Sequence, residues 1–138
     1  MFPVTTRMGG MCFAFPDVCG VPDPTTGSPV PTPFPNTAQC PSALIFTCSA
    51  IVKVLNQAVL LSTSVIPSSD GDQAGVYGGV TSGMIAGPVQ YRTGSTRVKI
   101  EGQSPVTVLH PTGHNGVSAN APAGAQVVPS QFTVLVAW

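Results

Sequence analysis

Two histidines that lie close together in one segment are the residues best suited to bind a metal. His110 and His114 are separated by Pro-Thr-Gly, and four cysteines are available as further donors: Cys12, Cys19, Cys40 and Cys48. Zinc takes imidazole and thiolate in tetrahedral sets, and such a site can hold together loops that bury little apolar surface. Since the cysteines lack tight C-x-x-C spacing, buried free thiols are the alternative interpretation.

Groups that could catalyse a reaction are scarce. The segment at residues 79–83 does not have the G-x-S-x-G spacing of a nucleophile elbow, and no Gly-Lys-Ser/Thr sequence marks a phosphate loop. Asp70 and Asp72 are interpreted as stabilising a turn, because no glutamate follows at the twelfth position of a calcium loop. We therefore predict a protein that is not an enzyme. The rival is a small metalloenzyme whose turnover depends on His110 or His114.

The composition points to a protein with a permanent partner. The 138 residues are 43% hydrophobic, enough for a core in one domain (1–138), while charged residues are only 7% against roughly 25% in an ordinary soluble domain. Part of the surface must then be neutral or apolar, and contiguous apolar patches usually mark contact sites. Five basic residues spread along the chain do not form the dense basic face of a nucleic-acid binder, so we predict no nucleic-acid partner.

No stretch of the sequence predicts a membrane span or a leader peptide. Residues 43–61 are the longest apolar stretch, but five polar residues interrupt it: Thr47, Ser49, Lys53, Asn56 and Gln57. The first seven residues carry no apolar segment behind their positive charge. We expect the protein to begin in the cytoplasm, where cysteines are thiols or metal ligands rather than disulfides.

A proline-rich segment follows the first cysteines. Residues 22–41 contain seven prolines, each of which fixes φ and removes a backbone donor. The segment is predicted to be extended or polyproline-like, and it cannot be a helix or a central strand. We expect a rigid N-terminal strap wrapped on the domain.

The remaining pattern predicts an all-β fold with internal repeats. Residues 52–61 read as strand, turn and strand, residues 98–108 repeat that shape, and each copy follows a serine, Ser49 or Ser95, by three residues. Residues 130–136 form a truncated third copy. Repeats of one unit favour a symmetric arrangement around an axis. The glycine-rich residues 68–83 and the alanine-rich residues 110–129 are expected to be loops.

Several segments together resemble one known family. They are GMCFAFPDVC at 10–19, PVPTPFPNTA at 29–38, GDQAG at 71–75, GGVTSG at 78–83, Asn115, and PSQFTV at 129–134. They are similar to the PAAR-like family of type VI secretion, although the PAAR tetrapeptide itself is absent. The resemblance implies a compact cone of short β-hairpins with pseudo-threefold internal symmetry.

The resemblance also implies a function and a partner. One monomer would cap the homotrimeric valine–glycine repeat spike, with its broad base on the spike and its apex toward the target, and would leave the cell with the machine. A separate effector chain could be carried. A tail-tip protein of a phage-like contractile particle is the structurally similar alternative.

The family further implies a metal near the apex, held by histidines and one cysteine. We therefore expect zinc or iron bound by His110 and His114 with Cys12 and Cys19, since these cysteines lie in the segment most similar to the family. Cys40 and Cys48 are the alternatives. The chain has only two histidines, fewer than the family pattern, so the cysteines must contribute more.

Overall fold

A single long antiparallel hairpin is the largest unit of the fold. In the computed structural model, which describes residues 2–116 and 118–137, β2 (Met11–Pro22) pairs with β3 (Pro29–Gln39) along nearly their whole lengths. Residues that alternate between buried and exposed at the start of β2 give the strand one face toward the core. The hairpin belongs to a six-stranded antiparallel sheet, in the order β3-β2-β9-β8-β7-β6.

The other strands are shorter. The sheet also contains β6 (Val65–Ile66), β7 (Val89–Tyr91), β8 (Pro111–His114) and β9 (Ala121–Val128). Two further antiparallel pairs join β4 (Lys53–Val54) to β5 (Gln57–Ala58), and β1 (Phe2–Pro3) to β10 (Leu135–Val136). Two 3₁₀ turns, Cys40–Ser42 and Ile45–Thr47, are the only helical elements in the described ranges, and neither could cross a membrane. The all-β prediction is confirmed.

The proline-rich segment is a strand rather than a wrapped strap. Its prolines at 29, 31, 33 and 35 occupy alternate positions of β3, and β3 is the edge strand of the sheet. Because alternate residues of a strand direct their N–H groups to the same side, all four missing donors fall on the outer edge, where no ladder bond is lost. The prediction that this segment is extended and not a central strand is thus confirmed, whereas its wrapped path was wrong.

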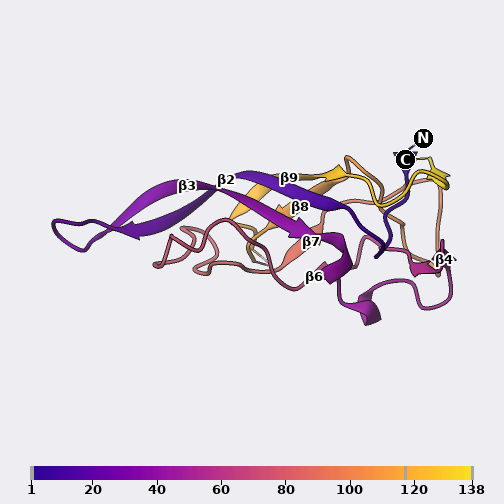
Figure 1. Cartoon of the computed structure of the whole chain (residues 1–138), viewed down its shortest axis with the longest axis horizontal. Helices are drawn as coiled ribbons and strands as arrows, with labels where there is room; N and C mark the ends of the chain where they lie inside the picture. The colour runs from indigo at the N-terminus through magenta and orange to yellow at the C-terminus, as the bar shows by residue number, and fades with distance from the viewer. Residues whose placement is uncertain (1, 117, 138) are drawn as a thin grey trace.

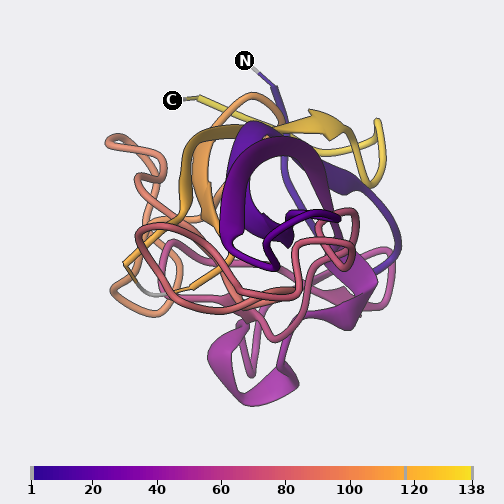
Figure 2. The ribbon, with the colours of Figure 1, turned by 90° about the vertical axis from the view of Figure 1, so that its left-hand side faces the viewer.

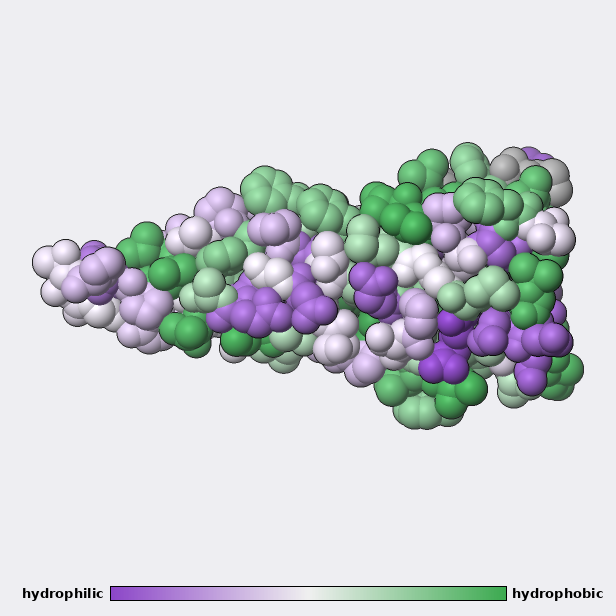
Figure 3. Space-filling view, viewed as in Figure 1, coloured by the Kyte–Doolittle hydropathy of each residue, from purple (hydrophilic) through white to green (hydrophobic). Residues whose placement is uncertain are grey.

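The molecule tapers from a broad end to a narrow end. The turn of the β2–β3 hairpin forms the narrow end, while both chain termini and β4 lie at the broad end (Figures 1 and 3). Figure 2 looks along the long axis from the narrow end and shows the hairpin near the centre with the loops around it. This shape agrees with the predicted cone. We call the broad end the base and the narrow end the apex.

The alanine-rich segment, predicted as a loop, contains two central strands of the sheet. β8 and β9 both fall within residues 110–129 and pair with each other in the middle of the sheet. Their small residues reflect tight packing. A Cβ at Gly124 would lie only 2.6 Å from Thr112 Oγ1 and 2.9 Å from Ala14 Cβ. Low β-propensity therefore marks close packing here, and the loop prediction was wrong.

Candidate functional site

Three strand segments meet in a closed ring of backbone hydrogen bonds near the base. Thr5 N donates to Val106 O (2.9 Å), Val106 N to Leu60 O (3.2 Å), and Leu60 N to Thr5 O (2.9 Å). All three residues are fully buried. The bridges Val4↔Thr107, Thr6↔Val59 and Leu61↔Pro105 each continue one of these three antiparallel pairings by one residue. We call this ring the strand triangle. It places a pseudo-threefold axis in a single chain.

The two predicted repeats leave the strand triangle as matching hairpins. Ser49 Oγ accepts a hydrogen bond from Val52 N (2.9 Å), and Ser95 Oγ accepts one from Val98 N (3.1 Å). Each serine therefore caps the first strand of its hairpin in the same way. The turns also match, since residues 55–56 and 101–102 all have positive φ, as a type I′ turn requires. The predicted duplication is confirmed.

The third copy is assembled from the two ends of the chain. β10 supplies its first strand and β1 its second. Gln131 replaces the serine: its Oε1 accepts from Val134 N (2.8 Å) and its Nε2 donates to Val4 O (2.9 Å). In the other copies the backbone N–H of the serine makes the second bond, to Val59 O or Pro105 O. The predicted third copy is confirmed, but its use of the N-terminal strand was missed.

The three hairpins give the base a repeated apolar surface. Equivalent positions carry Val52, Val98 and Val134, and then Val54, Ile100 and Val136. Val52 and Val134 are 37% and 39% exposed. The positions that follow them carry Lys53, Lys99 and Leu135, so two of the three hairpins add a positive charge beside the apolar side chains. Such a surface is suited to contact with another protein.

A buried polar cluster lies along the β2–β3 hairpin, farther from the base than the strand triangle. Asp17 and Cys19 point to the same face of β2, because they are two residues apart, and the loop that follows β6 adds Asp72. Single donor atoms of these three fully buried residues all lie within 4.8 Å of one another. We call them the Asp-Cys-Asp cluster. Among the residues that the structure describes, no other group of three histidine, cysteine or acidic side chains is as close.

Side-chain amides surround the Asp-Cys-Asp cluster. Asp17 Oδ2 accepts from Asn36 Nδ2 (3.0 Å), and its Oδ1 accepts from Asn115 Nδ2 (3.2 Å) and from Asn120 Nδ2. Asp72 Oδ1 accepts from the backbone N–H of Ala86 (3.0 Å). These bonds tie the hairpin to the glycine-rich loop and to the segment between β8 and β9. The cluster therefore holds the narrow part of the molecule together.

The pKa values of the two carboxyl groups in the cluster are shifted in opposite directions. Burial works against ionisation of Asp17, but hydrogen bonds from Asp72 and the asparagines outweigh it and lower the pKa of Asp17 below its ordinary value. Burial, together with Asp17, raises the pKa of Asp72 to about 6. Burial and the two neighbouring carboxylates raise the pKa of Cys19 to about 12. Asp72 therefore takes up a proton below about pH 6 while Asp17 stays ionised, and the thiol stays protonated unless a cation replaces its proton.

The structure separates the four predicted metal ligands. Cys19 lies in the Asp-Cys-Asp cluster, and His114 is connected to it only through Asn36, whose Oδ1 is 2.7 Å from His114 Nδ1. His110 lies near the strand triangle, with its Nδ1 2.8 Å from Thr107 N. Cys12 contacts Tyr91 Oη at 3.5 Å. Sequence reasoning missed Asp17 and Asp72, although the Asp-x-Cys spacing on a strand was a usable signal.

The donor atoms of the cluster fit a transition metal. A thiolate and two carboxylates are ligands that zinc and iron accept. Hydrogen bonds to the two carboxylates come only from neutral groups within the described part of the chain, so no side-chain cation balances their charge. Protonation of Asp72 would remove one of the two charges, and a bound cation would balance both. The cluster could bind a metal, and it supplies three of the four ligands of a tetrahedral site.

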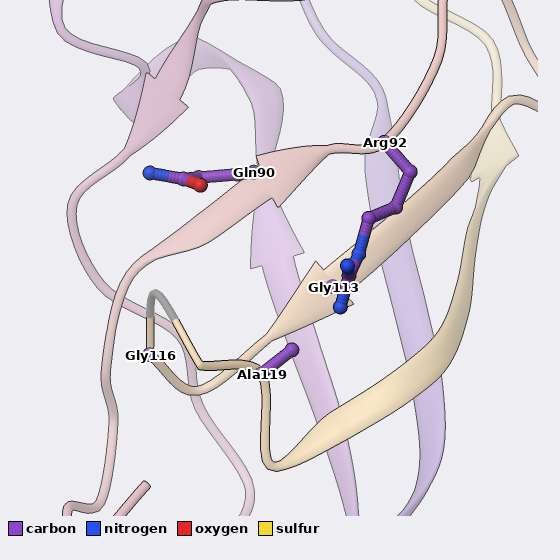
Figure 4. A pocket seen from close by; sticks show the side chains of 5 residues that line it. All are labelled: Gln90, Arg92, Gly113, Gly116 and Ala119. Carbon is purple, nitrogen blue, oxygen red and sulfur yellow. The ribbon is translucent and has the colours of Figure 1, made fainter.

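A shallow pocket beside β7 and β8 has no catalytic groups. It is lined by Gln90, Arg92, Gly113, Gly116 and Ala119 (Figure 4). None of these residues is a nucleophile or a group that exchanges protons near neutral pH. The pocket therefore offers no site for a reaction.

Comparison with known proteins agrees with these observations. The family described as the toxin PAAR-like domain matches residues 10–123. The DNase toxin Tse7 of Pseudomonas aeruginosa is 34% identical over 110 residues, which cover 76% of this chain and 28% of Tse7. The chain thus corresponds to little more than a quarter of that relative. No solved structure matches. The resemblance drawn from the sequence segments is confirmed: the chain belongs to the toxin PAAR-like domain family.

Proposed function

We propose that residues 1–138 act as one domain that caps the end of a trimeric valine–glycine repeat spike in a type VI secretion system. The strand triangle is the observation that carries this proposal. A single chain can meet a threefold-symmetric partner evenly only if it presents three near-equivalent faces. The three hairpins at the base provide them, with apolar side chains at matching positions.

The proposed role is structural. The domain would bind as one monomer per spike trimer, its base on the spike and its apex pointing away. The only pocket described above has no reactive group, so catalysis would come from another chain or another part of a larger protein. Tse7 is a DNase toxin and is much longer than the matched region, which supports a separate toxic unit alongside a domain of this kind.

Stoichiometry tests the capping role. The chain mixed with a purified valine–glycine repeat trimer should give a complex of one cap per three spike chains by native mass spectrometry. Val52→Glu with Val134→Glu should abolish the complex, because two charges would enter the apolar base. Val76→Glu is the matched control, since Val76 is also exposed, at 62%, but lies outside the three hairpins. A complex with three caps, or one that survives the base substitutions, would contradict the proposal.

The location of the protein follows from the same role. The cap would assemble on the spike in the cytoplasm and leave the cell when the sheath contracts. The chain should then be found in the culture medium of cells with an active machine, and only inside cells that lack the sheath. Release that does not depend on the sheath would argue for another route.

A second proposal concerns the metal. We propose that zinc or iron binds Cys19, Asp17 and Asp72, with His114 as the nearest predicted source of a fourth ligand. The metal would neutralise the buried carboxylates and link the hairpin to the glycine-rich loop where there is little apolar core. Of the predicted ligands, His110 and Cys12 lie at other places in the fold.

Elemental analysis tests the metal site. Protein purified without a histidine tag should contain about one metal per chain, as expected for a single site. Cys19→Ser and Asp72→Asn should each lower that content, whereas Cys12→Ser and His110→Asn should not. A metal-free protein from medium supplied with both metals would contradict this proposal.

A further inference from the structure

Two buried thiols lie at the root of the β2–β3 hairpin, the end at which its two strands join the rest of the fold. Neither takes part in the functions proposed above. Cys12 lies at the start of β2, and Cys40 directly follows β3. Both side chains are fully buried in the main apolar cluster. Each sulfur is 3.5 Å from the same hydroxyl oxygen, Tyr91 Oη. One phenol therefore brings the two thiols together.

The strand register places the two cysteines diagonally across the ladder. Cys12 is paired with Ala38, and the backbone N–H of Cys40 donates to Gly10 O at 3.0 Å. Residues 38 and 40 point to the same face as Cys12, because side chains alternate along a strand. Diagonal neighbours on one face are close enough for side chains to touch. The proximity of the two thiols raises the pKa of Cys12 and lowers that of Cys40.

We propose that Cys12 and Cys40 form a disulfide when the chain folds in the presence of a disulfide oxidant. The bond would join the first residues of β2 to the end of β3 and close the root of the hairpin that forms the apex. The other two cysteines are not candidates for this pairing: Cys19 lies in the Asp-Cys-Asp cluster, and Cys48 contacts Leu44 O and Ser64 Oγ. The inference does not depend on the spike.

The chemistry is a two-step thiol–disulfide exchange. The Cys40 thiolate attacks one sulfur of a low-molecular-weight disulfide and releases the other half as a thiolate. The Cys12 thiolate then attacks the Cys40 sulfur of the mixed disulfide and releases the second half. Two protein thiols lose two electrons and two protons in all, and the oxidant becomes two thiols. The roles of the two cysteines can be exchanged, because the contact that lowers the pKa of Cys40 exists only in the closed fold.

Burial decides when the bond can form. Both thiols are inaccessible in the folded chain, so an oxidant reaches them only while the hairpin root is open. Oxidation should therefore be fast during refolding and slow in the folded protein. The same burial would protect the finished bond from reductants. Tyr91 would keep its hydrogen bond to Gln126 Oε1 (2.9 Å) and lose only two weak thiol contacts.

Refolding in glutathione tests the proposal on a variant that retains only these two cysteines, Cys19→Ser with Cys48→Ser. After refolding with oxidised and reduced glutathione, its mass should fall by about 2 Da, the two hydrogens lost in forming one disulfide. A protease that cuts before aspartate should release a disulfide-linked pair of peptides, since Asp17 and Asp23 lie between the two cysteines. The melting temperature should rise by about 5–10 °C over the reduced form.

The wild-type chain provides the second measurement. Its refolded form should contain the same linked peptides, and Cys12→Ser should remove both the link and the gain in melting temperature. Circular dichroism of Cys12→Ser with Cys40→Ser should show the same β-rich fold, which separates loss of the bond from loss of structure. The proposal is overturned if the two-cysteine variant refolds with both thiols free, or if wild type links either residue to Cys19 or Cys48 instead.

Discussion

At the scale of single residues, one glutamine side chain replaces a stretch of backbone. Gln131 is only 5% exposed and makes four hydrogen bonds through its amide, two from Oε1 and two from Nε2. In the other hairpins a serine uses its hydroxyl and its backbone N–H for the corresponding contacts. The longer side chain takes over both contacts of the serine, its Oε1 as acceptor and its Nε2 as donor, so the third copy keeps the same hydrogen-bond pattern.

Gln131→Ala should therefore destabilise the fold by about 2–3 kcal/mol, because four backbone groups of Val4, Thr133 and Val134 lose hydrogen bonds worth roughly 0.5–1.5 kcal/mol each, and water can replace some of them. Chemical denaturation would measure the change. Gln103→Ala is the matched control: Gln103 is exposed and pairs through its backbone only, so it should shift stability by less than about 0.5 kcal/mol. Equal losses for the two variants would mean that the amide of Gln131 is unimportant.

His114 makes the protein sensitive to acid. Burial lowers the pKa of His114 to about 4 from an ordinary value of 6.5. Asn36 donates through Nδ2 to Asp17, so its Oδ1 accepts from His114 Nδ1–H, and Nε2 accepts from the Thr112 hydroxyl at 2.9 Å. The neutral ring is fully satisfied, and an added proton would have no acceptor except Thr112.

Stability that depends on His114 should be present above pH 6.5 and lost as the pH falls toward 4. In that range the unfolded chain binds a proton that the folded chain does not. The loss for this residue is up to about 3 kcal/mol, at about 1.4 kcal/mol per pKa unit. His114→Gln should flatten the difference between denaturation at pH 7 and at pH 4.5. The same slope in both proteins would show that other groups cause the acid sensitivity.

At the scale of elements, two hairpins use the same turn type with residues that differ in how well they accept positive φ. Glu101 and Gly102 form the turn of one hairpin, with φ of 53° and 81°, while Leu55 and Asn56 form the other, with φ of 52° and 63°. Leucine is an unfavourable residue for positive φ, whereas asparagine and glycine accept it. Leu55 and Glu101 therefore both occupy a first turn position that their side chains disfavour, whereas Asn56 and Gly102 suit the second position.

Leu55→Asn should stabilise the protein by about 0.5–1 kcal/mol, since an Asx residue suits the first position of a type I′ turn. Thermal denaturation should show an increase of a few degrees. Leu55→Ala removes the same exposed side chain but keeps an unfavourable residue at positive φ, so it should give no such increase. If both variants gain equally, the exposed leucine side chain and not the backbone is responsible.

The elements also show which parts of the fold are predictable from sequence. Residues 52–61 and 98–108 were predictable because each hairpin is local and has its turn signal between its strands. β9 was not, because its alanines and Gly124 report packing against Ala14 and Thr112 rather than strand propensity. The third hairpin was only half visible, since β1 and β10 come from opposite ends of the chain.

The residues of the candidate site also divide into those whose proximity the sequence can show and those whose proximity it cannot. Asp17 and Cys19 share a face because of their spacing along β2, which a sequence can show. Asp72 joins them only through the path of the glycine-rich loop. Gly75 belongs to that path: its missing side chain leaves room for Cys19, whose Cβ would lie 2.3 Å from an added Cβ. Long-range contacts of this kind have no local signal, which explains why Asp72 was interpreted as a turn residue.

At the scale of the whole molecule, a buried chain of hydrogen bonds joins the root of the β2–β3 hairpin to the base. The thiols at the root of the hairpin contact Tyr91 Oη, which donates to Gln126 Oε1, and Thr5 Oγ1 donates to the same oxygen. Thr5 belongs to the strand triangle. The hairpin is therefore fixed directly to the part of the molecule that would rest on the spike. Force on the apex would pass through ordered groups rather than through a flexible joint.

The pseudo-threefold symmetry predicts that the chain tolerates circular permutation. The gap between the termini stands where the other two hairpins have their turns. Joining the two ends of the chain would connect β10 to β1 through three residues, 137, 138 and 1, a length common in hairpins. Opening the chain between Leu55 and Asn56 would create an equivalent gap in the first hairpin and remove the strain at Leu55. This permutant should fold to the same β-rich structure with a melting temperature within a few degrees of the parent, as circular dichroism would show.

A permutant opened between Leu60 and Leu61 is the matched control, because the cut falls inside the strand triangle rather than in a turn. It should fail to fold cooperatively, since Leu60 N and Leu60 O both take part in the ring. If both permutants fold equally well, the ring is not needed to define the base. If neither folds, continuity of the first hairpin matters more than the symmetry, and the three hairpins are not equivalent in the way their hydrogen bonds indicate.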